Sequence, residues 1–96
     1  MLQAVWEDYR DRGVTFVGVA FQTDEAAIAD SLATHGVTYQ VGLDAVGQIA
    51  VSYGITGVPE TFILSPEGAI TFVGVGPLRE SVLRAELDAV LAEAAP

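Results

Sequence analysis

The chain has 96 residues, of which 51% are hydrophobic, and this size and composition fit one small globular domain. Thirteen acidic residues against four basic ones give a formal net charge of −9, which argues against binding to the phosphate backbone of nucleic acid. The sequence has no cysteine, so these residues offer no disulfide, no thiolate nucleophile and no cysteine-based metal site.

No apolar run approaches the length of a transmembrane helix, and the N-terminus lacks the basic and apolar regions of a signal peptide. The sequence therefore predicts a soluble chain with no membrane segment. The lack of cysteine does not identify a compartment, because it fits both oxidising and reducing surroundings.

Apolar side chains at helical spacing predict a first helix with Leu2, Val5, Trp6 and Tyr9 on one face. Gly13 is placed to cap its C-terminal end. No N-cap residue precedes the helix, so we expect an element entered from further upstream. Trp6 and Tyr9 are expected in the core.

The run Val14–Phe21 is apolar nearly throughout, which is typical of a parallel strand covered on both faces. Thr23 is the expected N-cap of the next helix, with acidic residues in its first turn. That helix carries Ile28 and Leu32 and should end near Gly36.

A short strand is predicted at Tyr39–Leu43 and a short helix at Gly47–Tyr53. The strands Thr61–Leu64 and Ile70–Val75 flank a turn of Pro and Gly at residues 65–69, which predicts an antiparallel hairpin. A closing helix is predicted by one apolar face, formed by Leu83, Leu87, Val90 and Leu91. The alternating order of helices and strands indicates an α/β sandwich.

The segment Gly54–Leu64 is the most informative part of the chain. Proline cannot donate to a sheet ladder, so Pro59 should stand at the start of the following strand. Because a cis peptide bond is cheap only before proline, the Val58–Pro59 bond is a candidate for a fixed cis turn.

The motif Gly-Val-Pro-Glu-Thr-Phe at residues 57–62 is followed by a Ser-Pro-Glu-Gly turn. This sequence resembles the cis-proline loop of the TlpA/ResA/DsbE branch of thioredoxin-fold thiol–disulfide oxidoreductases. The predicted order of elements matches the same branch. The resemblance implies a thioredoxin-like three-layer α/β sandwich with a mixed sheet. It covers residues 1–96 as one partial domain that starts in the family's first main helix and is therefore N-terminally truncated.

In that family a strand precedes the first helix, and a Cys-x-x-Cys motif lies between the two. The resemblance therefore implies that this chain is redox-inactive by itself, with no catalytic residue, no cofactor and no metal ligand. It also implies that the substrate-binding residues are Val58, Pro59 and Glu60, where the backbone before the proline pairs with an extended substrate. The alternatives are that Pro59 is only a rigid strand entry and Glu60 only a solvated edge residue.

Two readings of function stay open. The first is a thioredoxin-fold domain of thiol–disulfide oxidoreductase ancestry, which in a longer form has a protein thiol partner and an extracytoplasmic location by family resemblance. The second is a non-catalytic thioredoxin-like module for binding or assembly. A peroxiredoxin-type peroxidase is a weaker third reading. The DNA upstream of Met1 distinguishes the first two, by a strand followed by Trp-Cys-x-x-Cys or by a nearby stop codon.

The resemblance places the missing strand between Val14–Phe21 and Thr61–Leu64. Unpaired strand edges promote association, so we expect a homodimer or larger assembly through these edges or through the first-helix face around Leu2, Val5 and Trp6. His35, at a predicted helix end, complements the helix dipole and has no second ligand at metal-binding spacing.

Overall fold

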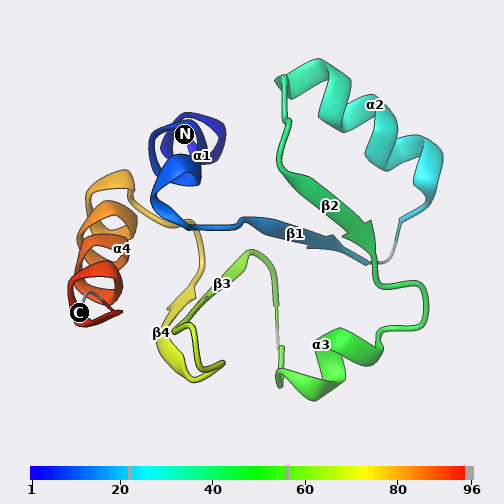
Figure 1. Cartoon of the computed structure of the whole chain (residues 1–96). Coiled ribbons are helices and arrows are strands. Elements are labelled where there is room, and N and C mark those ends of the chain that lie inside the picture. The colour runs from blue at the N-terminus through cyan, green and yellow to red at the C-terminus, as the bar shows by residue number, and fades with distance from the viewer. Residues whose placement is uncertain (22, 56, 95–96) are drawn as a thin grey trace. The chain divides into compact units, whose positions relative to one another are not determined.

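The computed structural model describes residues 1–21, 23–55 and 57–94 of the chain (Figure 1). Its internal contacts divide it into two compact units, residues 1–54 and 55–96. One unit contains a parallel strand pair and the other an antiparallel pair, so both kinds of pairing expected of a mixed sheet are present. A single domain over residues 1–96 stays a prediction.

The first unit begins with helix α1 (Leu2–Tyr9), which continues into a short 3-10 helix η1 (Arg10–Arg12). Gly13 follows in the left-handed conformation with φ 83°, which confirms its predicted place at the helix end. Tyr9 is buried, as the sequence predicted. Val5 is also fully buried, so it cannot provide the open helix face that we expected for association.

Strands β1 (Val17–Ala20) and β2 (Gln40–Leu43) pair in parallel. β1 is shorter than the predicted Val14–Phe21, and the prediction of a strand covered on both faces is wrong. Val17 and Val19, on one face, are 60% and 46% exposed, whereas the intervening residues are half-buried. An apolar run shows that both faces of a strand could be buried. It does not show that other elements of the chain pack on both faces.

Helix α2 (Glu25–His35) connects these strands. Its N-cap is Asp24, whose carboxylate accepts a hydrogen bond of 2.8 Å from the Ala27 N–H, so the prediction of Thr23 as the cap is wrong by one position. An N-cap side chain bonds the amide about three residues further along the chain. Because the helix starts at Glu25, the residue in the N-cap position is Asp24. Gly36 ends the helix in the left-handed conformation, as predicted.

A polar clamp ties α1 to the segment that enters β2. The Gln3 side chain donates to the Thr38 hydroxyl at 2.6 Å and accepts from the Thr38 N–H at 2.9 Å. Beside the clamp, the Tyr39 ring makes edge-to-face contacts with Trp6 and Phe16, at centroid distances of 6.2 and 5.8 Å. These contacts fix where β2 begins relative to the first helix. The unit closes with the short helix α3 (Gln48–Ser52).

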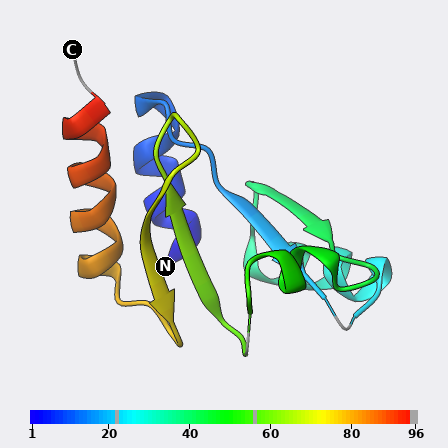
Figure 2. The same cartoon turned by 90° about the horizontal axis from the view of Figure 1, so that it is seen from below.

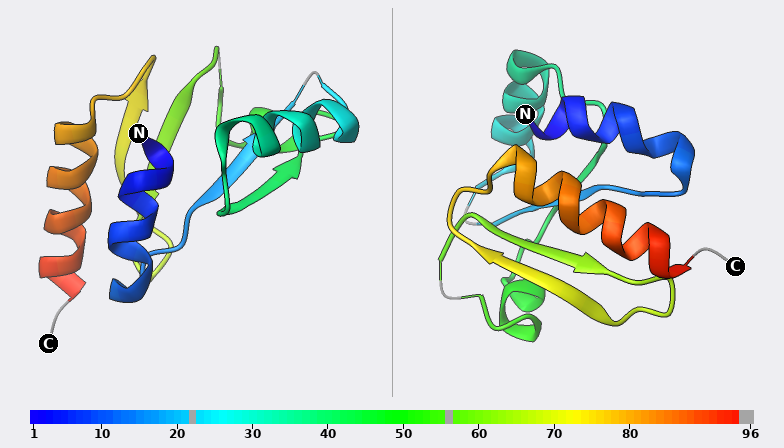
Figure 3. Two further views of the ribbon diagram at one scale, coloured as in Figure 1. Left: turned by 90° about the horizontal axis from the view of Figure 1, so that it is seen from above. Right: turned by 90° about the vertical axis from the view of Figure 1, so that its left-hand side faces the viewer.

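The second unit contains β3 (Glu60–Leu64), β4 (Ile70–Val75) and helix α4 (Glu80–Ala94). The strands form the predicted antiparallel hairpin, and its turn is closed by a 2.8 Å bond from the Ser65 N–H to the Ala69 carbonyl. Figure 2 and Figure 3 show α4 running beside this hairpin. The buried side chains of the unit are Ile63, Leu83 and Leu87.

Candidate functional site

The loop before β3 is held in place by the hairpin that follows it. The Pro59 carbonyl accepts a 2.9 Å hydrogen bond from the Gly76 N–H, and the next residue, Glu60, pairs with Val75. The ladder therefore begins at Pro59, the one residue here that has no N–H to offer, as the sequence predicted. The Val58–Pro59 peptide bond is cis, the geometry that the sequence predicted.

Val58 lies just outside this ladder. Its side chain is 69% exposed, and no other described residue forms a hydrogen bond with its backbone. Val75 is 79% exposed, and its pairing with Glu60 places both side chains on one face of the hairpin. The loop thus combines exposed apolar groups, a half-buried carboxylate and accessible backbone.

The sequence model of the Redoxin family matches residues 1–91. The chain belongs to the redoxin family. It is 28% identical over 78 residues to the thiol-disulfide oxidoreductase ResA of Bacillus subtilis, covering 81% of this chain and 44% of ResA. It is 35% identical over 80 residues to the thiol:disulfide interchange protein DsbE of Pseudomonas fluorescens biotype C, covering 82% of this chain and 45% of DsbE.

The fold comparison agrees with these relatives. A thioredoxin-family thiol:disulfide interchange protein from Chlorobium tepidum TLS superposes with a TM-score of 0.83 and 26% identity, covering 94% of this chain and 66% of that one. This redoxin is therefore a thioredoxin-fold domain related to the ResA and DsbE oxidoreductases. It spans less than half the length of those two curated relatives.

Disulfide exchange needs a thiolate, and the 96 residues of this redoxin contain no cysteine. The loop exposes a backbone segment at Val58 and the apolar side chains of Val58 and Val75, which are groups suited to backbone pairing and apolar contact rather than to catalysis. None of the helices in the part of the chain that the structure describes is long and apolar enough to cross a membrane.

His35 contacts its own helix. Its Nδ1 lies 2.9 Å from the Ser31 carbonyl oxygen, so Nδ1 carries a hydrogen and donates it to the last turn of α2. The Ser31 hydroxyl is 3.5 Å from the same nitrogen, but a donating Nδ1 cannot activate it as a base. Within the described ranges, no group of three or more potential metal ligands occurs.

Asp44 is the important polar residue that the sequence reasoning missed. It is 5% exposed, and its carboxylate accepts hydrogen bonds from the backbone N–H groups of Ile49 (3.2 Å) and Ala50 (3.0 Å). Its own N–H donates to the Ala20 carbonyl at 2.7 Å, so one residue joins β1 to the start of α3. The sequence feature that could have predicted this role is an aspartate just before a helix whose N-cap residue, Gly47, has no side chain to accept a hydrogen bond.

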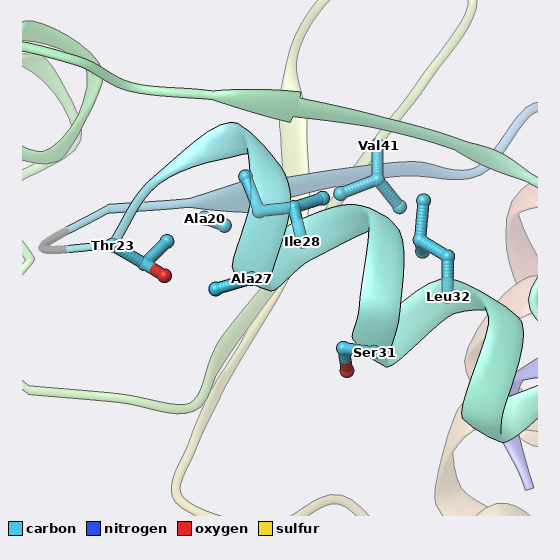
Figure 4. Close-up of a pocket in the computed structure, with 7 residues that line it drawn as sticks. All are labelled: Ala20, Thr23, Ala27, Ile28, Ser31, Leu32 and Val41. Atoms are coloured by element: carbon cyan, nitrogen blue, oxygen red, sulfur yellow. The ribbon is translucent and has the colours of Figure 1, made fainter.

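A groove of about 220 Å³ lies between α2 and the β1–β2 pair. Figure 4 shows Ile28 and Leu32 of the helix directed toward Val41 of the strand. The groove is smaller than the roughly 300–1,000 Å³ of most small-molecule sites, so it is helix–sheet packing space and not a ligand pocket. Its other lining residues are Ala20, Thr23, Ala27 and Ser31.

Proposed function

We propose that this redoxin chain is the partner-binding part of a thiol–disulfide oxidoreductase domain of the ResA/DsbE kind, with Val58, Pro59 and Glu60 as the partner-binding loop. The observation that carries the proposal is the exposed Val58, whose backbone is unbonded by other described residues while Pro59 is anchored in the ladder. The redox step needs thiols that lie outside these 96 residues.

The partner that fits this loop is a protein segment in extended conformation, carrying a thiol or disulfide in the redox reaction. Its backbone would pair with Val58, and each such hydrogen bond contributes about 0.5–1.5 kcal/mol net. Backbone pairing tolerates many partner sequences, and the exposed Val58 and Val75 side chains favour an apolar one. The resemblance to the ResA and DsbE oxidoreductases supports a location outside the cytoplasm for such a reaction.

A second function is favoured by the lack of cysteine in this chain, namely a non-catalytic module in which the same loop binds a partner without electron transfer. Activity separates the two functions. A fragment of a ResA-type relative that carries its Cys-x-x-Cys would restore disulfide reduction when mixed with this chain if the first function is correct. Binding without any restored reduction would support the non-catalytic module.

A titration with an extended peptide tests the loop. The probe is an unstructured, uncharged peptide with valines and one serine in place of cysteine, added to isotope-labelled chain. The amide signals of Gly57, Val58, Glu60 and Thr61 should move. Val58→Pro removes the N–H and should weaken binding by up to about tenfold, as expected for one lost hydrogen bond.

Val58→Ala is the matched control, because it trims the side chain and keeps the backbone donor. It should bind within a few-fold of the original chain, and both variants should keep the amide spectrum of the hairpin. Equal binding by Val58→Pro and the original chain would refute backbone pairing at this loop.

We also propose that the chain forms a homo-oligomer through the edge of β1. Among the described strands β1 pairs only with β2, and Val17 and Val19 project from its open face. A charged residue on an edge strand opposes edge-to-edge pairing, so Val19→Lys should lower the molar mass measured by light scattering. A monomer at every accessible concentration would refute this association.

A further inference from the structure

The antiparallel hairpin turns one of its faces toward α4. Opposed residues of an antiparallel pair share a face, so the paired residues Ile63 and Phe72 lie together, with Gly74 two positions further on. Ile63 is buried, and a Cβ built at Gly74 would lie 3.3 Å from the Leu78 side chain, in the segment that leads into α4. This inner face is therefore the one that α4 and the segment before it cover (Figure 3).

The opposite face of the hairpin is apolar and open. Strand alternation puts Glu60, Phe62 and Leu64 on it from β3, and pairing adds Val75 opposite Glu60 and Val73 opposite Phe62. Val73 and Leu64 are 47% and 42% exposed, and Val75 is more exposed than either. Within the second unit, α4 is the helix that the structure describes, and it lies on the inner face. We call Glu60, Phe62, Leu64, Val73 and Val75 the outer hairpin face.

The charges of the hairpin favour a basic partner. Residues 58–76 contain two carboxylates, Glu60 and Glu67, and neither lysine nor arginine. Glu60 is half-buried on the outer hairpin face, where the other side chains carry no charge. The whole chain has a formal charge of −9, so a basic partner is attracted from a distance and an acidic one is repelled. A second copy of this chain brings the same negative charge and is the less favourable occupant.

The outer hairpin face offers side chains, and not the backbone groups of a strand edge, so the partner that it fits is a helix. The inner face shows the type of helix. Leu83 and Leu87 of α4 are buried and stand four positions apart, which makes them one apolar stripe. A two-stranded sheet has the same width on both faces, so the outer hairpin face can accept a stripe of the same kind.

We propose that the outer hairpin face is a docking surface for an amphipathic helix of a partner protein, which carries a lysine or arginine that pairs with Glu60 beside its apolar stripe. The stripe would cover Phe62, Val73 and Val75, and removing these side chains from water drives the contact. Docking on side chains does not use the backbone of Val58. The inference therefore does not rest on peptide pairing at the loop.

Titration of isotope-labelled chain with two synthetic helical peptides tests the docking surface. Both peptides have about 18 residues, with one leucine stripe and alanine at most other positions; one carries lysines beside the stripe and the other glutamates. The lysine peptide should move the amide signals of Phe62, Val73 and Val75, and it should bind at least about tenfold more tightly than the glutamate peptide. Equal affinities, or signals that move only in residues 1–54, would overturn the proposal.

Val73→Lys places a positive charge in the middle of the outer hairpin face and should weaken binding of the lysine peptide at least about tenfold. Val46→Lys is the matched control, because it makes the same change of charge at an exposed valine of the first unit, and it should bind within a few-fold of the original chain. Glu60→Gln should weaken binding more than Glu67→Gln, which removes the same charge in the hairpin turn. Circular dichroism should show all four variants folded. A Val73→Lys variant that binds as the original chain does would refute docking on this face.

Two further measurements identify other occupants of the outer hairpin face. Nuclear Overhauser contacts from the methyl groups of Val73 and Val75 to residues 1–54 would show that the chain covers this face itself. A dimer in sedimentation equilibrium that Val73→Lys dissociates would identify a second copy as the occupant. Either result would overturn the proposal. Val58→Pro should bind the lysine peptide as the original chain does, so a failure of backbone pairing at the loop is distinguishable from a failure of helix docking.

Discussion

Replacing Asp44 with alanine should destabilise the first unit, because among the described residues its carboxylate is the side-chain group that bonds the first-turn amides of α3. The substitution deletes two bonds from a carboxylate to backbone amides, at 3.2 and 3.0 Å. The Ile49 side chain is 42% exposed, so water can replace the carboxylate at its N–H more readily than at Ala50, which is half-buried. Loss of a helix cap costs about 0.5–2 kcal/mol, and a buried amide without a partner adds to this.

We therefore expect Asp44→Ala to lower the free energy of unfolding by about 2 kcal/mol. Asp44→Asn should lose about half as much, because its amide oxygen still accepts one bond. In a domain of this size, about 1 kcal/mol corresponds to roughly 4–8 °C in Tm. Urea unfolding followed by circular dichroism measures the loss, and hydrogen exchange at the Ile49 and Ala50 amides reports whether it is local.

Asp30→Ala is the control for charge, because it removes one carboxylate from the exposed surface of α2. Relief of repulsion in an acidic chain should make that variant neutral or slightly more stable. If Asp44→Ala unfolds at the same urea concentration as Asp30→Ala, and the α3 amides keep their protection, the buried carboxylate does not anchor the helix.

Three further measurements bear on the same structure. Gln3→Ala removes the clamp on Thr38 and should cost about 0.5–1.5 kcal/mol in urea unfolding, whereas Gln48→Ala should be near neutral; equal effects would contradict the clamp. Gly18→Ala should be less stable than Gly42→Ala, because a Cβ at position 18 would lie 3.0 Å from a Val41 methyl and one at position 42 meets nothing within 4 Å. The chain should show no insulin reduction above a dithiothreitol blank, and turnover free of contaminants would refute this.

Local turn chemistry explains which parts of the fold were predictable. The hairpin turn at residues 65–69 and the left-handed glycines Gly13 and Gly36 are set by residues within a few positions of each other. The position of the loop at residues 57–62 was predictable for the same reason, because proline determines where the hydrogen-bond ladder of the strand can begin. Such features need no knowledge of the distant parts of the chain.

Contacts between distant residues account for what the sequence did not reveal. Gln3 and Thr38 are far apart in the chain, and nothing in either neighbourhood marks them as partners. From the sequence, Asp44 is interpreted as the end of a strand. Its role in capping α3 is seen only in the structure, where the N-cap residue Gly47 has no side chain that could accept a hydrogen bond. The open face at Val17 and Val19 could not be foreseen, because the composition of a strand does not state what packs on it.

Salt separates two of the contacts proposed for this chain. At the β1 edge the attraction comes from backbone pairing and apolar contact, and the main opposing force is repulsion between copies that each carry a charge of −9. Because the Debye length shortens from about 30 Å at 0.01 M ionic strength to about 8 Å at 0.15 M, added salt should strengthen self-association. An uncharged peptide at Val58 meets no such repulsion, so its affinity should stay constant over the same range. Sedimentation and peptide titration in parallel measure both responses. Self-association that weakens with salt would mean that attractive ion pairs hold the copies together, and the β1 edge would then not be the contact.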